Sequence, residues 1–250
     1  MNMKRNKWRM ILDIARTELQ TLFYSPIAWL TLIIFVVQAS MTFSSVFGTY
    51  VERFNLGYRP VNLTQGIFSG FRGLYTSILP YLFYYFPLLT MGLMSRELSS
   101  GSVKLLYSSP VNNIQIILGK FVSMMIYALV FVGILLVFII FGACTIDHFD
   151  FWLTVSGLLG VYLLICSYAA IGLFMSSLTS YQIVAALGTL SILFVLNMVG
   201  GLWQDIEWVR DITWWLSISG RANEFISGLI CSEDVLYFVF VTGLFLTLSV

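Results

Sequence analysis

Charge is scarce in this sequence. Of its 250 residues, 10% are charged and 59% are hydrophobic. A soluble domain carries roughly 25% charged residues, so this chain lacks the polar side chains to cover a water-facing surface, and we expect lipid to cover much of it. The net charge of +1 gives no sign of a nucleic-acid partner.

Histidine and cysteine are also rare. The single histidine, His148, lies in a short acidic outer loop, and the sequence has no second histidine and no Cys–His arrangement that would build a catalytic or zinc site around it. The three cysteines, Cys144, Cys166 and Cys231, lack metal-like spacing. A Cys144–Cys231 disulfide requires both residues to lie on an oxidising side of the membrane.

Catalytic and nucleotide-binding motifs are missing. Gly119-Lys120 is the one Gly-Lys pair, but Ile114 stands where a phosphate-binding loop needs its first glycine, and Phe121 where it needs Ser or Thr. Residues 217–220 faintly resemble an intramembrane serine nucleophile, without a histidine in a later span. We therefore expect no enzyme activity, no metal and no directly bound cofactor.

Long apolar runs are what the sequence has instead. A bilayer core about 30 Å thick needs about 20 apolar residues per helix. Five runs reach this length, and a sixth reaches the last residue after 16 residues, so we expect its helix to continue beyond Val250. The six predicted spans of this single 1–250 transmembrane domain are Pro26–Phe47, Leu74–Met94, Phe121–Ala143, Phe151–Met175, Ile183–Trp203 and Val235–Val250.

Residues 1–25 form a tail and an amphipathic segment ahead of the first span. Apolar residues recur at helical spacing over Trp8–Tyr24, and Ser25-Pro26 ends the segment. The pattern predicts a helix that lies in the membrane interface. Its apolar face comprises Trp8, Ile11, Leu12, Ala15, Leu19, Leu22 and Phe23.

The distribution of charge predicts the orientation. With the N-terminus inside and alternating spans, the inner segments hold eight basic and three acidic residues, and the outer segments hold five basic and nine acidic residues. The positive-inside rule therefore favours a cytoplasmic N-terminus in the cytoplasmic (inner) membrane. The C-terminus is then also inside, and the segment between the second and third spans faces the cytoplasm.

Residues 203–234 on the outer side hold four of the seven tryptophans. Indole rings prefer the headgroup level, and apolar residues recur at helical spacing around Trp208 and Trp215. We interpret this segment as a half-inserted, re-entrant helical hairpin. The alternative is an ordinary outer loop anchored by its aromatic residues.

The segment Met94–Lys120 is a polar insert in an otherwise apolar chain. Ser99–Ser102 is typical of a turn followed by a helix start, with Ser102 as the N-cap. A short helix over 103–107 would end before Pro110, and Asn112 or Asn113 would cap the helix that enters the third span. A short helix attached to two spans can transmit a push to both. The alternative is a plain connecting loop, which in helical bundles is usually about 2–8 residues long.

Polar residues inside the spans are few, with Gln38 and Asn197 the clearest. Amides in lipid are costly unless paired, so we expect both to face other helices. Gly172 and Ser176, four residues apart, favour close approach of helices.

Two segments resemble the ABC-2 type permeases, the membrane subunits of a group of ABC exporters. The first runs from Glu97 through Gly101, Leu105-Leu106 and Pro110 to Leu118-Gly119-Lys120, and is similar to the family pattern E-x3-G-[TS]-x2-LL-x3-P followed by LGK. The second, Glu224–Phe238, resembles the stretch that leads those permeases into their last span. The nearest branch looks like the small permeases that include the gliding-motility-associated and nitrous-oxide-reductase maturation permeases.

The resemblance implies roles for three segments. The first would be a coupling helix that docks on an ATPase subunit, through Arg96, Glu97, Gly101, Lys104, Leu105, Leu106 and Pro110. The residues of the outer re-entrant segment would include Trp208, Trp215, Glu224, Phe225 and Gly228. The N-terminal helix would be the elbow helix. Lys104 departs from the family, where this position is often acidic, and suggests an acidic contact on the partner.

The resulting expectation is an all-α, six-span permease subunit of an ATP-driven exporter. A partner ABC ATPase would bind ATP and Mg²⁺, and a second permease half, identical or different, would complete the unit. The alternative is a non-transporting membrane anchor or assembly factor that recruits a cytoplasmic protein through the same insert. The aliphatic and aromatic spans favour an amphipathic or hydrophobic cargo, and also fit a chain that transmits motion without carrying cargo.

Overall fold

The computed structural model describes residues 3–57, 62–102, 112–146, 148–199 and 217–250, and within these ranges every regular element is an α-helix. The helices are α1 (Met3–Tyr24), α2 (Pro26–Asn55), α3 (Leu63–Phe68), α4 (Leu74–Thr90), α5 (Ser95–Ser100), α7 (Asn113–Thr145), α8 (Phe151–Leu178), α9 (Gln182–Met198), α11 (Ile218–Ile226) and α12 (Ser232–Leu248). The all-α prediction is confirmed for this part of the chain.

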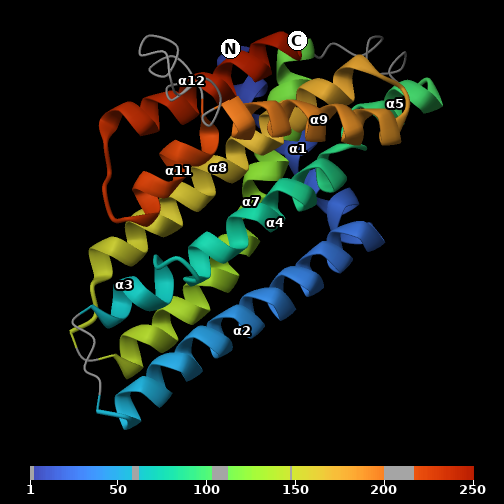
Figure 1. The fold of residues 1–250 in the computed structure, drawn as a ribbon. Helices are drawn as coiled ribbons and strands as arrows, with labels where there is room; N and C mark the ends of the chain where they lie inside the picture. The colour runs from blue at the N-terminus through green and yellow to red at the C-terminus, as the bar shows by residue number, and fades with distance from the viewer. Residues whose placement is uncertain (1–2, 58–61, 103–111, 147, 200–216) are drawn as a thin grey trace.

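The long helices form an elongated bundle with α8 near its centre (Figure 1). Helix α8 packs against α4, α7, α9, α11 and α12, and 17 of its residues are buried. We call the end that holds α1, α5 and the start of α7 the α1 end. The opposite end, with α3 and the last turn of α2, is the α3 end (Figure 1).

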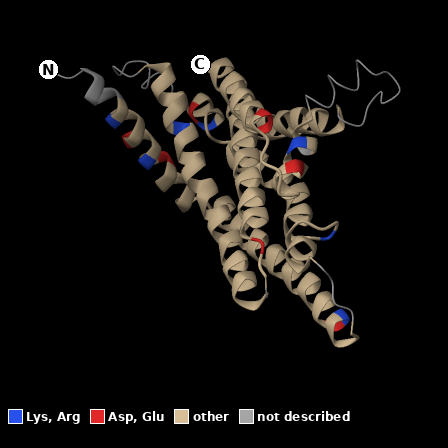
Figure 2. Ribbon diagram, turned by 90° about the vertical axis from the view of Figure 1, so that its left-hand side faces the viewer, with Lys and Arg blue, Asp and Glu red and all other residues tan. Residues whose placement is uncertain are grey.

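Within the described residues, four segments are long and apolar enough to cross a membrane: Pro26–Asn55, Leu74–Ser100, Asn113–Thr145 and Phe151–Leu178. The fifth and sixth predicted runs form α9 and α12, of 17 residues each. A helix of this length rises about 25 Å. Charged residues gather along α1 and near the helix ends, and long stretches of the described helices carry none (Figure 2).

Two helix starts follow the predicted signals. Ser25 is the N-cap of α2, with Pro26 in its first turn, where a missing N–H costs nothing. Asn112 is the N-cap of α7, and its backbone N–H donates to the Gln115 side chain at 3.1 Å. Both predicted boundaries are confirmed.

The end of the second predicted span is different from the prediction. The helix α4 ends at Thr90, and residues 91–94 form a turn before α5 begins. The turn predicted over Ser99–Ser102 is confirmed only at Gly101 and Ser102, because Ser99 and Ser100 belong to α5, which ends at Ser100 with Gly101 as its C-cap. Gly101 has φ 70°, a left-handed conformation that glycine adopts without strain and that commonly stops helices.

Helix α1 uses its apolar face unevenly. Ile11, Ala15 and Leu22 are buried, where α1 makes its most extensive contact, with α7. Trp8 and Leu12, placed on the same face by the sequence pattern, are 71% and 57% exposed. One edge of the face therefore packs on protein, and the other stays open to the surroundings.

Candidate functional site

The predicted docking segment is divided by the structure. Arg96 and Glu97 lie on α5 and Gly101 follows it. Lys104, Leu105, Leu106 and Pro110 lie outside the described residues, so the predicted helical turn at 103–107 stays a prediction. The structure shows which helices contact α5.

Helix α5 is tied to two other helices by a buried lysine. Lys120, in the second turn of α7, has 1% of its side chain exposed. Its Nζ donates to Glu97 Oε1 of α5 at 2.7 Å and to Glu18 Oε1 of α1. The glutamates are 16% (Glu18) and 24% (Glu97) exposed. One cation thus joins three helices at the α1 end, and we call these three residues the Lys120 cluster.

The two carboxylates leave the Lys120 cluster with a formal charge of −1. Glu97 Oε2 is buried and makes no hydrogen bond. A buried charge without its partner is costly, and the cluster contains only one cation for two acids. Removing Lys120 would therefore leave two carboxylates facing each other in a partly dry site.

Gly119 lets α1 come close enough for this contact. A Cβ at position 119 would lie 2.7 Å from Ile14 Cγ2 and 3.2 Å from the Ile11 carbonyl oxygen. The Gly-Lys pair that superficially resembles a phosphate-loop ending thus serves helix packing, with the glycine under α1 and the lysine paired to its carboxylate.

Ser176 on α8 holds the break between α4 and α5. Its Oγ accepts hydrogen bonds from the backbone N–H groups of Met94 (2.9 Å) and Ser95 (3.0 Å) and donates to the Met91 carbonyl at 3.0 Å. These bonds satisfy backbone groups that an unbroken helix would pair internally, which is the reason that α4 stops before Met94. Gly172, one turn earlier, packs directly against Thr90.

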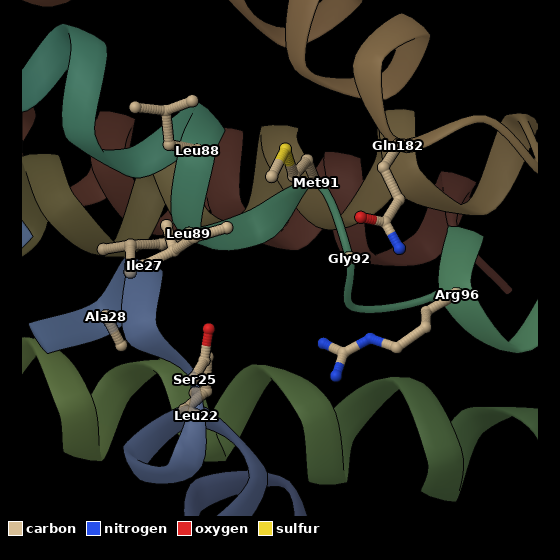
Figure 3. A pocket seen from close by; sticks show the side chains of 10 residues that line it. All are labelled: Leu22, Ser25, Ile27, Ala28, Leu88, Leu89, Met91, Gly92, Arg96 and Gln182. Carbon is tan, nitrogen blue, oxygen red and sulfur yellow. The ribbon is translucent and has the colours of Figure 1, made fainter. Parts of the chain in front are cut away.

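Arg96 lines a small cavity at the α1 end (Figure 3). The cavity has a volume of about 250 Å³ and lies where the α1–α2 junction meets the α4–α5 turn and the start of α9. Arg96 Nη2 lies 3.1 Å from the position of a Cβ on Gly92, so the guanidinium folds back over this glycine. Its neighbour Glu97 pairs with Lys120. The two charged residues of α5 therefore face different sites, Arg96 the cavity and Glu97 the Lys120 cluster.

A second buried ion pair lies at the start of α12. Arg221 on α11 pairs with Asp234 Oδ1, and the two side chains are 6% and 3% exposed. The Arg221 guanidinium also lies 4.8 Å from the ring centroid of Tyr237. Residues 227–231 connect the two helices, and Gly228 there has φ 92°. We call α11, this connection and α12 up to Tyr237 the C-terminal hairpin.

The C-terminal hairpin is inserted against α8. The Ser156 hydroxyl donates to the Phe225 carbonyl at 2.9 Å, and Phe225, fully buried, packs on Gly160. Glu224 is partly exposed, and burial together with the neighbouring Asp234 raises the pKa of its carboxyl. Trp208 and Trp215 lie outside the described residues.

A larger cavity, of about 490 Å³, lies between α4, α8, α9 and α11. Aromatic and aliphatic side chains, such as Phe83 and Phe194, form most of its wall. Tyr168, Asn197 and Asn223 add polar groups, so this space is amphipathic. The prediction for Gln38 is confirmed, because it accepts a hydrogen bond from Tyr85 of α4 at 2.8 Å.

Catalytic groups do not converge in the described part of the chain. His148 is exposed in a turn with φ 60°. Ser217 caps α11 by accepting from the Gly220 N–H at 3.3 Å, and all three cysteines are free thiols. Glu224, Cys231 and Asp234 place ligand atoms within 4.8 Å of one another, but Arg221 already occupies one Asp234 oxygen.

Sequence reasoning missed the most connected residues. In the sequence, Glu18 was counted only as a charge for orientation, Lys120 as such a charge and as the end of the Leu118-Gly119-Lys120 motif, and Ser176 only as a small residue. One signal was available, because Lys120 is a lone charge among apolar residues, the type that is rarely buried unless it is paired. Its partners stand 102 and 23 positions away, which no local pattern indicates.

The long apolar helices in the described part of the chain are those of a multi-pass membrane protein. Residues 12–206 match the family model described as ABC-2 family transporter protein, which is more than three quarters of the chain. The chain therefore belongs to the ABC-2 family of transporter membrane proteins, whose members are the membrane components of ABC transporters and lack an ATPase domain of their own. No curated protein matches the sequence.

The matched range covers one of the two family-like segments and not the other. It includes the whole polar insert and the Lys120 cluster, and it ends before α11. The resemblance of Glu224–Phe238 to the approach of a last span, and the branch within the family, stay predictions. Membership does imply an ABC ATPase partner and membrane embedding.

Proposed function

We propose that this chain is the permease subunit of an ATP-driven ABC-2 exporter. It crosses the cytoplasmic (inner) membrane six times, and its N-terminus lies in the cytoplasm. A partner ABC ATPase binds ATP and Mg²⁺ and docks on the segment from Arg96 to Pro110. A second permease half completes the unit. Family membership supports the class, and the Lys120 cluster is the single observation that supports the mechanism.

The Lys120 cluster makes α5 a handle on three parts of the bundle. A force applied at α5 reaches α7 and α1 through Lys120, and it reaches α8 through the hydrogen bonds of Ser176. Closure of an ATPase dimer would displace α5 and carry these helices with it. Such a displacement changes the bundle only if the two states differ in contacts, and the break after Thr90 supplies a site where α4 and α5 can change their angle.

The orientation is supported by charge and tested by labelling. In a background with Cys144, Cys166 and Cys231 replaced by serine, Ser100→Cys reports the α1 end and Leu56→Cys the α3 end, because both positions are exposed. We expect a membrane-impermeant maleimide to label Cys at position 100 only in inverted vesicles and at position 56 only in right-side-out cells. The opposite pattern would overturn the proposed docking side.

The C-terminal hairpin is proposed to be the outer re-entrant segment, together with Trp208 and Trp215. Gly160, which contacts Phe225, stands nine residues into α8 from Phe151. At about 1.5 Å per residue this puts Phe225 roughly 14 Å along α8 from the α3 end, deeper than a surface loop would lie. The larger cavity beside α11 supports an amphipathic cargo that passes this segment.

Docking of the ATPase is tested in the native complex. The tagged chain is purified from native membranes in mild detergent, and co-purifying subunits are identified by mass spectrometry. We expect an ATPase with a phosphate-binding loop. Its absence would favour the alternative of a membrane anchor for a different cytoplasmic protein.

Point variants then test the contact itself. Glu97→Lys, Lys104→Glu and Pro110→Ala should reduce ATPase recovery or abolish the stimulation of its ATP hydrolysis by the permease, with normal amounts of the chain in the membrane. Ser45→Ala, far along α2 with its side chain exposed, is the control. Unchanged ATPase binding and stimulation in all three variants would contradict the proposed docking segment.

A further inference from the structure

The cavity beside Arg96 has the composition of a site for an amphipathic anion. Figure 3 shows the Arg96 guanidinium, the Ser25 hydroxyl and the Gln182 amide directed toward the same space. The remaining lining is largely aliphatic, with Leu22, Ile27, Ala28, Leu88, Leu89 and Met91. The lining thus combines one cation and two hydrogen-bonding groups with a mostly aliphatic wall.

Arg96 has no anionic partner among the described residues. The ion pairs at the α1 end involve Lys120, Glu18 and Glu97, and no hydrogen bond joins the Arg96 guanidinium to another described side chain. Guanidinium groups bind phosphate in a bidentate manner, and such charge-assisted hydrogen bonds are among the stronger ones in proteins. The N–H donors of the Arg96 guanidinium, which have no partner among the described residues, can therefore bind a phosphate.

In the proposed orientation, the cavity lies at the cytoplasmic membrane surface, where a membrane presents phosphates. It is formed by two helix junctions at the α1 end, the Ser25 link between α1 and α2 and the turn after α4. Apolar helices extend from this level toward the α3 end. Basic pockets between membrane helices, near the cytoplasmic surface, are the type of site that holds anionic lipid headgroups.

The shape supports a lipid over a free ion. A volume of about 250 Å³ is below that of a drug-sized pocket and suits a headgroup, with the acyl chains outside. Ile27 and Leu88 line the cavity and are 40% and 42% exposed, so they offer an apolar surface over which an acyl chain can lie. A free phosphate would gain nothing from these residues.

We propose that this cavity binds the headgroup of an anionic phospholipid, with its phosphate on Arg96, Ser25 and Gln182 and its acyl chain over Ile27 and Leu88. The lipid fills the space between the elbow formed by α1 and α2 and the turn that leads to α5. It therefore braces the region through which the proposed handle moves. The inference goes beyond the proposed transport function, and it rests on the proposed cytoplasmic side of the α1 end.

Native mass spectrometry of the delipidated, detergent-solubilised protein tests this proposal. Phosphatidylglycerol, phosphatidylcholine and soluble glycerol phosphate are each added to the wild type and to Arg96→Gln, Gln182→Leu and Arg16→Gln. Arg16 is the matched control, because it is an exposed arginine on α1 that does not line the cavity. A fluorescence thermal-shift assay with the same lipids checks folding and binding together.

We expect the wild type to prefer phosphatidylglycerol over phosphatidylcholine, and Arg96→Gln to weaken phosphatidylglycerol binding roughly five- to tenfold, as loss of one charge at a lipid surface does. Arg16→Gln should bind as the wild type does, and Gln182→Leu should be weakened by less. Equal binding of the two lipids by the wild type, or equal losses in Arg96→Gln and Arg16→Gln, would overturn the proposal. So would glycerol phosphate binding as tightly as the lipid.

If Arg96→Gln does not fold, Arg96→Lys and Gln182→Leu carry the test. Lysine keeps the charge and loses the planar fork, so phosphatidylglycerol preference should fall less than threefold with lysine, and Gln182→Leu should still lower it. Unchanged preference in Gln182→Leu, in a protein with wild-type thermal stability, would overturn the site. Neither result depends on an ATPase, so failure here leaves the proposed transport function untouched.

Discussion

Two buried charged sites lie in different parts of this molecule, and their ion pairs join residues over very different separations in sequence. The pair Arg221–Asp234 spans 13 positions and closes the C-terminal hairpin. The Lys120 cluster spans 102 positions between Lys120 and Glu18 and joins three helices. The first stabilises a local unit, and the second connects units that would otherwise move separately.

The two sites also differ in how they are buried. Arg221 and Asp234 are almost completely shielded, at 6% and 3% exposure. In the Lys120 cluster only the lysine is shielded, and both glutamates reach solvent. A shielded pair is costly to break, and the partly exposed glutamates make the Lys120 cluster less costly to break. We infer that the hairpin is a rigid local unit on α8, and that the Lys120 cluster is the rigid connection through which α5 carries α1 and α7.

The largest effect is expected for the shielded pair. Arg221→Met leaves the buried Asp234 carboxylate without its cation, which costs about 3–5 kcal/mol of unfolding free energy. Thermal unfolding in detergent measures the loss. Arg221→Met combined with Asp234→Asn should recover most of it, and Ser227→Ala, at an exposed position of the connection, should be near neutral. A single variant as stable as the double would contradict the rigid role of the hairpin.

A smaller loss is expected for the Lys120 cluster. Lys120→Met leaves two carboxylates together, but their partial exposure limits the cost to about 2–3 kcal/mol. Adding Glu97→Gln and Glu18→Gln should restore stability in the same thermal assay. Because the contact joins α5 to the bundle, the single variant should also lose ATPase stimulation. Full stimulation in a folded Lys120→Met protein would remove the distinction between the two regions.

Ser176 tests the second attachment of α5. Ser176→Ala deprives the Met94 and Ser95 N–H groups of their acceptor, which costs about 1–3 kcal/mol. Ser177→Ala is the matched control, because the Ser177 hydroxyl bonds only the Phe174 carbonyl of its own helix. Hydrogen exchange at residues 91–95 should rise in Ser176→Ala alone. Equal exchange in the two variants would mean that α8 does not hold the turn.

The smallest effect is a pH dependence of the C-terminal hairpin. Burial and Asp234 raise the pKa of Glu224 above its ordinary value, so the folded state binds a proton more tightly than the unfolded state. Stability is then highest below the unfolded pKa and falls as pH rises through the raised folded pKa. Thermal melts across this range should show the fall in the wild type and a flatter profile in Glu224→Gln. If the stability of the wild type and of Glu224→Gln changed with pH in parallel, groups other than Glu224 would cause the pH dependence.

The sequence predicted elements whose signals are local. The Ser25-Pro26 break, the Asn112 cap and the positions of the apolar helices all follow from neighbouring residues and hydropathy. The end of α4 at Thr90 could not be predicted, because hydropathy continues to Met94 and the cause of the break is a hydroxyl on α8. The exposure of Trp8 and Leu12 depends equally on how far α7 extends under α1.

The candidate site divides in the same way. Glu97 and Lys120 were both visible in one family-like segment, but their contact with each other and with Glu18 depends on the packing of α1 on α7. The orientation of Arg96 into a cavity formed by residues of five helices is also a property of the fold. The sequence therefore indicated which charged residues belong to the candidate site, but it did not indicate which residues they contact.

The rigidity of α5 relative to α1 is the central claim, and a distance measurement tests it most directly. Spin labels at Ser99→Cys and Thr17→Cys, both exposed positions, are introduced in the cysteine-free background. Double electron–electron resonance should give one narrow distance distribution in the otherwise wild-type protein, unchanged by ATP with the bound ATPase, and a broad one with Lys120→Met. An equally narrow distribution with Lys120→Met would contradict the account.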